Sequence, residues 1–294
     1  MILFLNQPKA QCGVYEYGYN TYSILSLYKD KHEFVYLECK NAKDYKAYLD
    51  NNNIEAVIAN YHPCTLGWFE KVYNLKPCLL MSHDQVFDFG DLNLILDPTF
   101  ESAGKNYSVP RTLFEFNQEV PVKKDTISTF GFAFEHKGFL ELLERVSIEY
   151  NQATLRIHMP KNSIVGCRQN RLSLELKRKV KSYINLEITN DYKSKNDLLK
   201  WLAESELNAF LYRGSSSNGI ASCTDWAISV GRPLAITNDK MFRHLPKELS
   251  VDQSSLKQIL QKKHLVEEIK IRWSSRKLYD KYCEAINVAK NLRS

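Results

Sequence analysis

The chain has 294 residues, of which 44% are hydrophobic and 25% are charged. This composition is typical of globular proteins and excludes long disordered segments. No apolar run reaches the roughly 18–20 residues that a membrane-spanning helix needs, and the length fits two domains of about 100–200 residues each.

The cysteines exclude two further classes of protein. Seven of them stand at positions 12, 39, 64, 78, 167, 223 and 283, an odd number without a C-x-x-C pair. This spacing indicates neither a disulfide framework nor a zinc knuckle. We therefore expect free thiols and a cytoplasmic protein.

The charge is divided unevenly along the chain. Residues 1–122 hold 10 Lys and Arg against 15 Asp and Glu, whereas residues 123–294 hold 30 against 19. A basic half favours a partner that carries phosphate, although lysines on solvated helix faces would give the same count. The basic residues lack the arginine–aromatic clustering of nucleic-acid-binding modules, so no nucleic-acid partner is expected. A peripheral contact with an anionic membrane surface stays open.

Residues 1–122 alternate between apolar runs and helical patterns. Such alternation predicts a parallel sheet with crossover helices. Strands are predicted at 2–6, 34–38, 54–59 and 77–82, and helices near 15–28, 43–50 and 66–74.

The pattern breaks into polar and proline-containing sequence near residues 109–124, and a new strand begins at Thr126. We predict an N-terminal domain at 1–122 and a C-terminal domain at 123–294 that includes a C-terminal helix. The expected fold class is α/β, with two Rossmann-like, doubly wound parallel-sheet domains facing a central cleft. In the second half, strands are predicted near 126–131, 153–158, 185–189, 207–211 and 233–236, and helices near 137–149, 171–182, 195–204, 219–229 and 266–291.

Ligands of such sheets bind beyond the carboxyl ends of the strands, so loops that follow strands are the candidate sites. The first is Gln11-Cys-Gly-Val-Tyr15. Gly13 and Val14 would let backbone amides approach a phosphate at a helix N-terminus. A simple turn is the alternative. The loop lacks G-x-G-x-x-G spacing, so NAD and FAD are disfavoured.

The second candidate is Ser82-His-Asp-Gln85, which directly follows an apolar strand. A polar cluster at this position can aim the imidazole of His83 and the carboxylate of Asp84 into a cleft. The alternative is that His83 caps a neighbouring loop, and the position alone does not decide between the two.

The third candidate ends a strand in Gly131 and places Lys137-Gly138 at the start of the next helix. A helix N-terminus already carries partial positive charge, so a lysine there is unfavourable unless an anion binds. Lys137 and the free amides therefore predict a diphosphate site. A merely solvated Lys137 is the alternative.

The fourth candidate is the most distinctive. After a strand, Leu211-Tyr-Arg-Gly-Ser-Ser-Ser-Asn-Gly-Ile220 forms a loop of small residues that leads into a helix, a glycine stop at Gly231 and another strand. The loop amides are expected to face the cleft. Asp225, in the second turn of the helix, is predicted to accept hydrogen bonds from both hydroxyls of a ribose.

Together these segments resemble the retaining E-x7-E glycosyltransferases of family 4 (group 1), which have the GT-B fold. The resemblance spans nearly the whole chain. In the second half, Asn218-Gly219-Ile220 is similar to the glycine-bearing loop, Asp225 to the second acid, Gly231-Arg-Pro-Leu-Ala235 to the G-x-P-V strand, and Gly131 through Lys137-Gly138 to the G-R-x(n)-K-G phosphate-binding stretch. In the first half, Cys12-Gly13-Val14 is similar to the glycine loop and His83-Asp84 to the post-strand histidine pair.

The resemblance implies a hexosyltransferase-type enzyme of carbohydrate biosynthesis. It would move a sugar from a nucleotide-sugar, bound by the C-terminal half, to a glycan, lipid-linked or other acceptor bound by the N-terminal half, with retention at the anomeric carbon. His83 would contact the transferred sugar rather than act as a base. The implied catalytic residues are His83, Asp84 and Lys137, and the implied donor-binding residues are Gly13, Val14, Gly131, Arg213, Ser217, Asn218, Gly219, Ile220 and Asp225.

The sequence contains no D-x-D triplet, which argues against the metal-dependent glycosyltransferase fold. We expect no metal and no cofactor besides the donor substrate. The charge of the leaving nucleoside diphosphate would then fall on Lys137, Arg213 and the loop amides near Gly13 and Gly219.

The sequence departs from the family pattern at two positions. Ser217 stands where the first glutamate of E-x7-E belongs, and Phe132 stands where an arginine usually follows the glycine. These losses keep a second hypothesis open, that of a catalytically silent nucleotide- or sugar-binding protein on the same fold.

Overall fold

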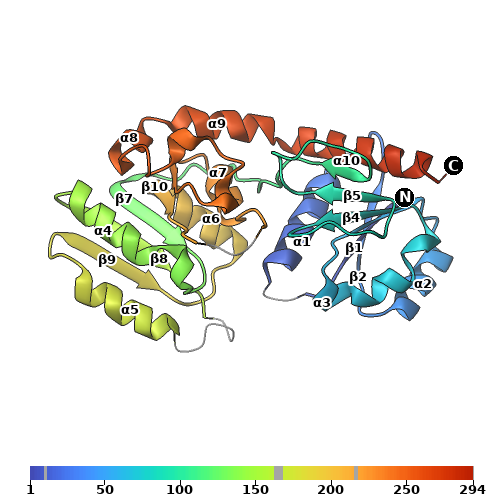
Figure 1. The fold of residues 1–294 in the computed structure, drawn as a ribbon, viewed down its shortest axis with the longest axis horizontal. Coiled ribbons are helices and arrows are strands. Elements are labelled where there is room, and N and C mark those ends of the chain that lie inside the picture. Colours follow the sequence, from blue (N-terminus) through green and yellow to red (C-terminus); the bar gives the residue numbers. More distant parts are fainter. Residues whose placement is uncertain (10–11, 162–167, 215–217, 294) are drawn as a thin grey trace. The chain divides into compact units, whose positions relative to one another are not determined.

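The computed structural model describes residues 1–9, 12–161, 168–214 and 218–293 (Figure 1). The chain forms two compact units. The first contains Met1–Thr112, Asn218–Ile220 and Arg272–Ser294, and the second contains Leu113–Ser217 and Ala221–Ile271. Each unit is built on a parallel sheet, which confirms the predicted α/β class with two Rossmann-like domains.

The first unit has a six-stranded sheet with the order β2-β1-β3-β4-β5-β6, in which all neighbouring strands are parallel. The order places β1 and β3 beside each other at the centre, so the polar residues that end these strands meet at one edge. The strands are β1 (Ile2–Asn6), β2 (Phe34–Glu38), β3 (Ala56–Ala59), β4 (Cys78–Ser82), β5 (Leu92–Ile95) and β6 (Asn106–Ser108).

Both faces of this sheet are covered by helices. Successive side chains of a strand point to opposite faces, and in β1 Ile2 and Phe4 join one core while Leu3 and Leu5 join the other. The first core also contains side chains of α1 (Gly13–Leu25) and α10 (Ser275–Asn291). The second contains side chains of α2 (Ala42–Asn51), α3 (Pro63–Leu66) and the 3-10 helix Gly67–Lys71, which a second 3-10 helix, Tyr73–Leu75, follows.

Strands β5 and β6 were not among the predicted strands. Asn93 interrupts the apolar run of β5 and hides its strand character in the sequence. Its side chain is nonetheless buried, because its amide nitrogen donates to the Phe87 carbonyl (2.9 Å) and to Asn106 Oδ1 (3.2 Å). A buried amide that is hydrogen-bonded in this way carries little penalty.

The second unit has a five-stranded sheet with the order β11-β10-β7-β8-β9. Helices α6 and α7 pack together through Leu198, Trp201 and Leu202, against Trp226 and the strand residue Phe130. The strands are β7 (Lys123–Phe130), β8 (Ala153–His158), β9 (Ile184–Thr189), β10 (Ser205–Phe210) and β11 (Leu234–Ile236), and the helices are α4 (Phe139–Glu149), α5 (Arg168–Lys179), α6 (Lys195–Ala203), α7 (Cys223–Ser229), α8 (Leu256–Leu260) and α9 (Lys263–Arg272). Three further 3-10 helices are Glu135–Lys137, Lys240–Phe242 and Lys247–Leu249.

The observed units differ from the predicted domains of 1–122 and 123–294 at both limits. The second unit begins at Leu113, because the Phe114 amide donates to Ser229 Oγ (2.8 Å) and its ring lies 4.0 Å from that of Trp226. The helix predicted at 266–291 is two helices, α9 and α10, and α10 belongs to the first unit.

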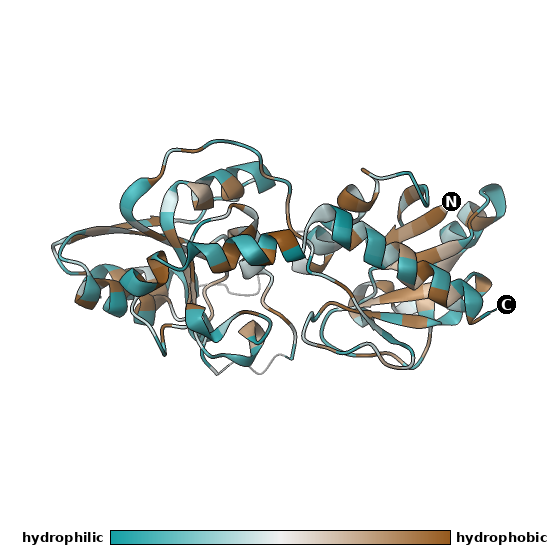
Figure 2. Ribbon diagram, turned by 90° about the horizontal axis from the view of Figure 1, so that it is seen from above, coloured by the Kyte–Doolittle hydropathy of each residue, from teal (hydrophilic) through white to brown (hydrophobic). Residues whose placement is uncertain are grey.

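The position of α10 follows from its apolar stripe. Leu278, Tyr282 and Ile286 are fully buried in the core of the first unit, where α10 contacts α1, β4 and β5. Figure 2 shows the general pattern, since the helices alternate between hydrophilic and hydrophobic residues while the strands of the first sheet are mainly hydrophobic. None of the helices described here is long and apolar enough to cross a membrane.

Candidate functional site

The candidate anion site of the second unit lies where β7 ends and α4 begins. Gly131 follows β7, Glu135–Lys137 form a 3-10 turn, and α4 starts at Phe139. Lys137 therefore precedes the helix rather than opening it. A Cβ built on Gly131 would lie 3.7 Å from Lys137 Cδ, so these two candidate residues lie close together.

Gly138 sits between Lys137 and α4 and has no side chain to cap the helix. Its φ is +67°, and a Cβ at this position would lie 1.8 Å from the Leu211 carbonyl oxygen. Only glycine fits here. The first amides of α4 therefore lack the side-chain acceptor that commonly satisfies such groups, and the helix dipole adds partial positive charge. This end of α4 is suited to an anion.

The Lys137 ammonium adds a full charge to this end of the helix. Its Nζ donates to the Tyr212 hydroxyl (2.6 Å) and lies 3.9 Å from the centroid of the Tyr212 ring. In the part of the chain that the structure describes, no carboxylate forms an ion pair with it. Burial lowers the pKa of Lys137, because desolvation penalises the charged form. An anion bound beside it would relieve this penalty.

Tyr212 was not among the predicted site residues. It lies two residues after the end of β10, is 2% exposed, and donates from its hydroxyl to Cys223 Sγ (3.1 Å). Its carbonyl accepts from Thr237 Oγ1 (2.5 Å). Burial raises the pKa of Tyr212 well above its usual value, so the phenol is neutral. The signal in the sequence is an aromatic residue with a polar tip just after a central strand.

Arg213, a predicted donor-binding residue, is paired with carboxylates in the structure. Its guanidinium forms ion pairs with Asp252 (2.6 Å) and Glu141 (2.9 Å). The Arg213 hydrogen bonds hold the pKa of each of these carboxyls below its usual value. Because two carboxylates already compensate the guanidinium, the geometry favours a structural role over binding of the diphosphate.

We predict that Arg213→Ala costs about 1 kcal/mol of stability, since these side chains are partly exposed, and changes donor affinity less than about twofold. Because Arg213 lowers the pKa of the Glu141 and Asp252 carboxyls in the folded protein, the ion pairs stabilise the fold fully above the pKa that these carboxyls have in the unfolded chain, about 4. This stabilisation is lost as the pH falls through their pKa in the folded protein. The difference in the free energy of unfolding between the variant and the wild type, measured by urea unfolding, should thus be largest at neutral pH and vanish in acid. The exposed Arg178→Ala is the control, and a tenfold loss of donor affinity would return Arg213 to the donor site.

Asp225 lies in the first turn of α7, because the helix begins at Cys223 and not near residue 219. Its side chain is 1% exposed, and its carbonyl accepts from Ser229 Oγ (2.6 Å). A ribose could reach the carboxylate only after the side chain became accessible, so its role as a ribose ligand stays a prediction. Ser217 lies outside the described residues.

In the first unit, α1 begins at Gly13, as the predicted glycine loop requires. Cys12 is the N-cap residue and makes no side-chain capping hydrogen bond, and a Cβ on Gly13 would meet nothing within 4 Å. Among the described residues the side-chain position of Gly13 is therefore open, and contact of the Gly13 and Val14 backbone with a phosphate stays a prediction.

Polar residues at the carboxyl ends of three neighbouring strands form one network in this unit. Asn6 ends β1, Asn60 follows β3 and His83 follows β4. The Asn60 amide nitrogen donates to Asn6 Oδ1 and to the Val14 carbonyl, both at 2.8 Å, and His83 Nε2 lies 2.7 Å from Asn60 Oδ1. Asn6 and Asn60 were missed in the sequence, although each is a polar residue directly at the end of an apolar strand.

His83 is a neutral imidazole in this network. Burial, followed by the positive charge of Arg111, lowers the pKa of His83 to about 3. Its ring packs edge-on against Tyr17 with centroids 5.7 Å apart, and the Arg111 guanidinium lies 4.7 Å from the centroid of the same Tyr17 ring. His83 thus contacts side chains of neighbouring strands and helices, which argues against a loop-capping role.

Asp84 is exposed and lies beside Gly219 within the first unit. A Cβ on Gly219 would lie 1.9 Å from Asp84 Oδ1, so the glycine permits this close approach. The structure therefore brings together two of the predicted residues that lie far apart in the sequence. Asn218 and Ile220 flank Gly219 in the same unit.

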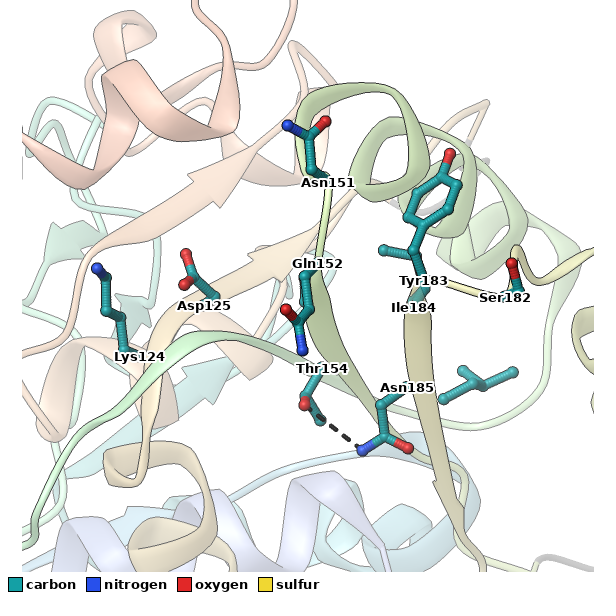
Figure 3. Close-up of a pocket in the computed structure, with 11 residues that line it drawn as sticks. Lys124, Asp125, Asn151, Gln152, Thr154, Ser182, Tyr183, Ile184 and Asn185 are labelled. Atoms are coloured by element: carbon teal, nitrogen blue, oxygen red, sulfur yellow. Dashed lines mark hydrogen bonds between the residues drawn. The ribbon is translucent and has the colours of Figure 1, made fainter.

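A separate hollow of about 720 Å³ lies at the opposite edge of the second sheet (Figure 3). It is lined by residues at the amino ends of β7, β8 and β9, among them Gln152, Thr154 and Asn185. The Asn185 amide donates to Thr154 Oγ1 at 3.4 Å. Doubly wound sheets bind ligands at the carboxyl edge, and none of the predicted site residues lines this hollow.

Within the ranges that the structure describes, no three His, Cys, Asp or Glu side chains are placed to hold a metal ion. No protein-family model and no curated protein matches the sequence.

Solved structures resemble the chain over nearly its whole length, and three of them are as follows. HepE from Anabaena in complex with UDP is 12% identical, with a TM-score of 0.69, over 97% of this chain and 99% of that chain. AviGT4, a glycosyltransferase involved in avilamycin A biosynthesis, is 11% identical, with a TM-score of 0.69, over 99% and 98%. An alpha-glucosyltransferase in complex with UDP is 13% identical, with a TM-score of 0.57, over 99% and 94%.

Further structures show HepE with UDP-glucose and the alpha-glucosyltransferase with UDP and a DNA that contains an HMU base. At such low identities the likeness establishes the fold. These neighbours have the GT-B fold, and the GT-B architecture expected from the sequence is thereby confirmed.

Proposed function

We propose that the chain is a glycosyltransferase that moves a sugar from a nucleotide-sugar donor to a glycan or lipid-linked acceptor. The observation that carries the proposal is Lys137, a partly buried cation that has no carboxylate partner in the described chain and lies at the uncapped start of α4. A nucleoside diphosphate supplies the negative charge that this arrangement lacks. Two of the structural neighbours, HepE and the alpha-glucosyltransferase, support a nucleotide-sugar, because their structures contain UDP or UDP-glucose.

In this proposal the second unit binds the donor and the first unit binds the acceptor. Negative charge develops on the diphosphate as the bond to the sugar breaks, and a cation fixed beforehand stabilises it without reorganisation. Lys137 and the α4 amides perform this task, and we propose that no metal ion is needed. Arg213 is left out of the reaction because Glu141 and Asp252 hold it.

We further propose that the reaction retains the anomeric configuration. With a pKa of about 3, the His83 imidazole is too weak a base to deprotonate an acceptor hydroxyl efficiently near neutral pH. It fits a contact to the transferred sugar instead. Asp84 is exposed and beside Gly219, where it is a candidate for binding the acceptor.

The direct test is a thermal-shift screen with UDP-, GDP-, ADP- and CMP-linked sugars, since a ligand that prefers the folded state raises the apparent stability. Release of the nucleoside diphosphate, with and without glycan and lipid-linked acceptors, then measures turnover. Binding without turnover would support the catalytically silent alternative. A gel-shift experiment with DNA tests whether the acceptor is a nucleic acid, as one structural neighbour suggests. The absence of any nucleotide binding would refute the proposal.

Asp225→Asn is predicted to weaken UDP binding about tenfold if the carboxylate accepts from the ribose, since a hydrogen bond to a charged group contributes about 1.5–3 kcal/mol. Titration calorimetry with UDP and 2′-deoxy-UDP on both proteins forms a double cycle. The preference for UDP over 2′-deoxy-UDP should be smaller in the variant than in the wild type, because a neutral amide oxygen accepts from the 2′-hydroxyl more weakly than a carboxylate does. Equal preference in both proteins would assign Asp225 a purely structural role.

A further inference from the structure

The hollow at the amino ends of β7, β8 and β9 belongs to the second unit alone, and an irregularity in β7 lies at its wall. Strand β7 uses residues 123–127 to cover the length that β10 covers with residues 205–207. On its other side β7 pairs with β8 only from Thr126 onward. Lys124 and Asp125 are thus extra residues in a bulge, and both line the hollow. Bulges re-aim side chains and are common beside binding sites.

Asp125 pays for its place in this bulge. Its φ is +50°, and it is the non-glycine residue with a left-handed backbone in the described part of the chain. Glycine usually occupies such a position, because a side chain there is unfavourable. The Asp125 amide donates to Glu206 Oε2 (2.8 Å), whereas its carboxylate makes no hydrogen bond or ion pair within the described residues. A strained acidic residue with a free carboxylate favours a role in binding over one in stability.

Two amide side chains continue this wall across the sheet. Because the strand order is β7-β8-β9, Gln152 before β8 lies between Asp125 and Asn185 of β9 (Figure 3). The Asn185 nitrogen donates to Thr154 Oγ1 (3.4 Å) and Glu187 Oε1 (3.2 Å). An ionised carboxylate only accepts, so this orientation is fixed and leaves Asn185 Oδ1 as a free acceptor among the described residues. The Gln152 amide is exposed and makes no hydrogen bond in the same part of the chain.

The chemistry of the lining restricts the ligand. Its ionisable groups of opposite sign, Lys124 and Asp125, stand side by side in the chain, so neither an anion nor a cation is favoured. An apolar ligand would leave the amides unpaired. A hydroxyl group both donates and accepts, and therefore matches carboxamides and a carboxylate together. The volume of about 720 Å³ lies within the range of small-molecule sites, about 300–1,000 Å³.

Tyr183 adds an aromatic surface to the same hollow. Its hydroxyl donates to the Ser147 carbonyl (2.8 Å), which anchors the side chain, while 41% of the residue stays exposed. Tyrosine combines an apolar ring with a polar tip, and a sugar has an apolar C–H face as well as its hydroxyls. The lining thus offers partners for both parts of a sugar.

We propose that this hollow binds a neutral oligosaccharide. Asp125 accepts from two neighbouring hydroxyls of one sugar, and Gln152 and Asn185 bind the hydroxyls beside it. The candidate donor site is separate, because Lys137 lies beyond the carboxyl end of β7 and the strand from Asp125 to Phe130 alone spans roughly 17 Å at about 3.3 Å per residue. Saccharide and nucleotide therefore do not compete. The inference does not rest on the proposed function, although a glycosyltransferase could use this hollow to hold its acceptor or product.

Proton–nitrogen NMR of the side-chain amides, in titrations with maltotriose, cellotriose, mannotriose and chitotriose, tests the proposal. At least one trisaccharide should shift the Gln152 signal, assigned from the spectrum of Gln152→Ala, with a dissociation constant of about 1 mM, as in weak binding of about 4 kcal/mol. Saturating UDP should leave this constant unchanged. The proposal is overturned if none of the four shifts the signal, if inorganic phosphate shifts it at lower concentration, or if UDP competes.

Variants assign the contacts. Asp125→Gly should weaken trisaccharide binding about tenfold, while the free energy of unfolding stays nearly unchanged, because relief of the left-handed strain offsets the greater freedom of glycine in the unfolded chain. Gln152→Ala should weaken binding about fivefold, and the exposed Gln261→Ala of the same unit is its matched control. Unchanged trisaccharide binding in both hollow variants would overturn the proposal. Failure of UDP to bind would refute the proposed function only, since the saccharide titration is independent of it.

Discussion

Replacing Lys137 by alanine is expected to lower kcat about 100-fold while changing the dissociation constant of the donor less than about fivefold. The ammonium stands at the start of α4 beside Tyr212, where the diphosphate gains charge as the sugar departs. An interaction that strengthens in the transition state affects kcat more than binding, and removing one such group typically costs about 10²–10³ in kcat.

Steady-state kinetics of nucleotide release, together with calorimetry of donor binding, would measure the two effects separately. Lys200→Ala is the matched control, because Lys200 is an exposed lysine of the same unit. Lys137→Arg should recover part of the rate, since it restores the charge but not the compact ammonium that fits over Tyr212. A loss in affinity as large as the loss in kcat would mean that Lys137 binds ground state and transition state alike.

Gly138→Ala is expected to destabilise the protein by about 3 kcal/mol or more. Its left-handed backbone costs a non-glycine residue about 1–2 kcal/mol, and a methyl group 1.8 Å from the Leu211 carbonyl oxygen forces a backbone shift that adds about 1–3 kcal/mol. Gly231 has the same φ of +67° but open space around its Cβ position, so Gly231→Ala should show the first cost alone.

Urea unfolding of both variants would separate the two costs. Because Gly138 joins Lys137 to α4, Gly138→Ala should also reduce turnover in whatever fraction remains folded, whereas Gly231→Ala should not. Equal destabilisation by the two substitutions would show that α4 and the segment after β10 have enough freedom to move apart.

The sequence predicted the structure best where a residue pattern is compatible with only one kind of element. Apolar runs located β1 and β4, and helical patterning placed the start of α4 within two residues of Phe139, where the helix begins. Arg213 could not be assigned, because an arginine after a strand looks the same whether it binds a phosphate or two carboxylates. Its partners, Glu141 and Asp252, are distant in the sequence and became visible only in the folded unit.

The Asn6–Asn60–His83 network was inaccessible for a related reason. Each residue ends or follows its own strand, and only the strand order β1-β3-β4 makes them neighbours. The sequence also did not reveal on which sheet α10 packs, because an amphipathic stripe predicts that a helix packs against a sheet but not which one. Propensity and periodicity describe single elements, whereas these features depend on how elements are brought together.

The return of α10 to the first unit has a consequence for biosynthesis. The first sheet is complete once residue 108 has been made, yet α10, which helps to cover one of its faces, follows the whole second unit in the chain. Apolar side chains such as Leu79 and Met81 share a core with α10. On the ribosome these side chains stay partly exposed to solvent until the second unit and α10 have been synthesised. Domains that emerge early from the ribosome usually fold early, but the first unit cannot complete its core before α10 has been made. We therefore expect the first unit to depend on chaperones during translation, and the packing of α10 on its sheet to be the last step of folding.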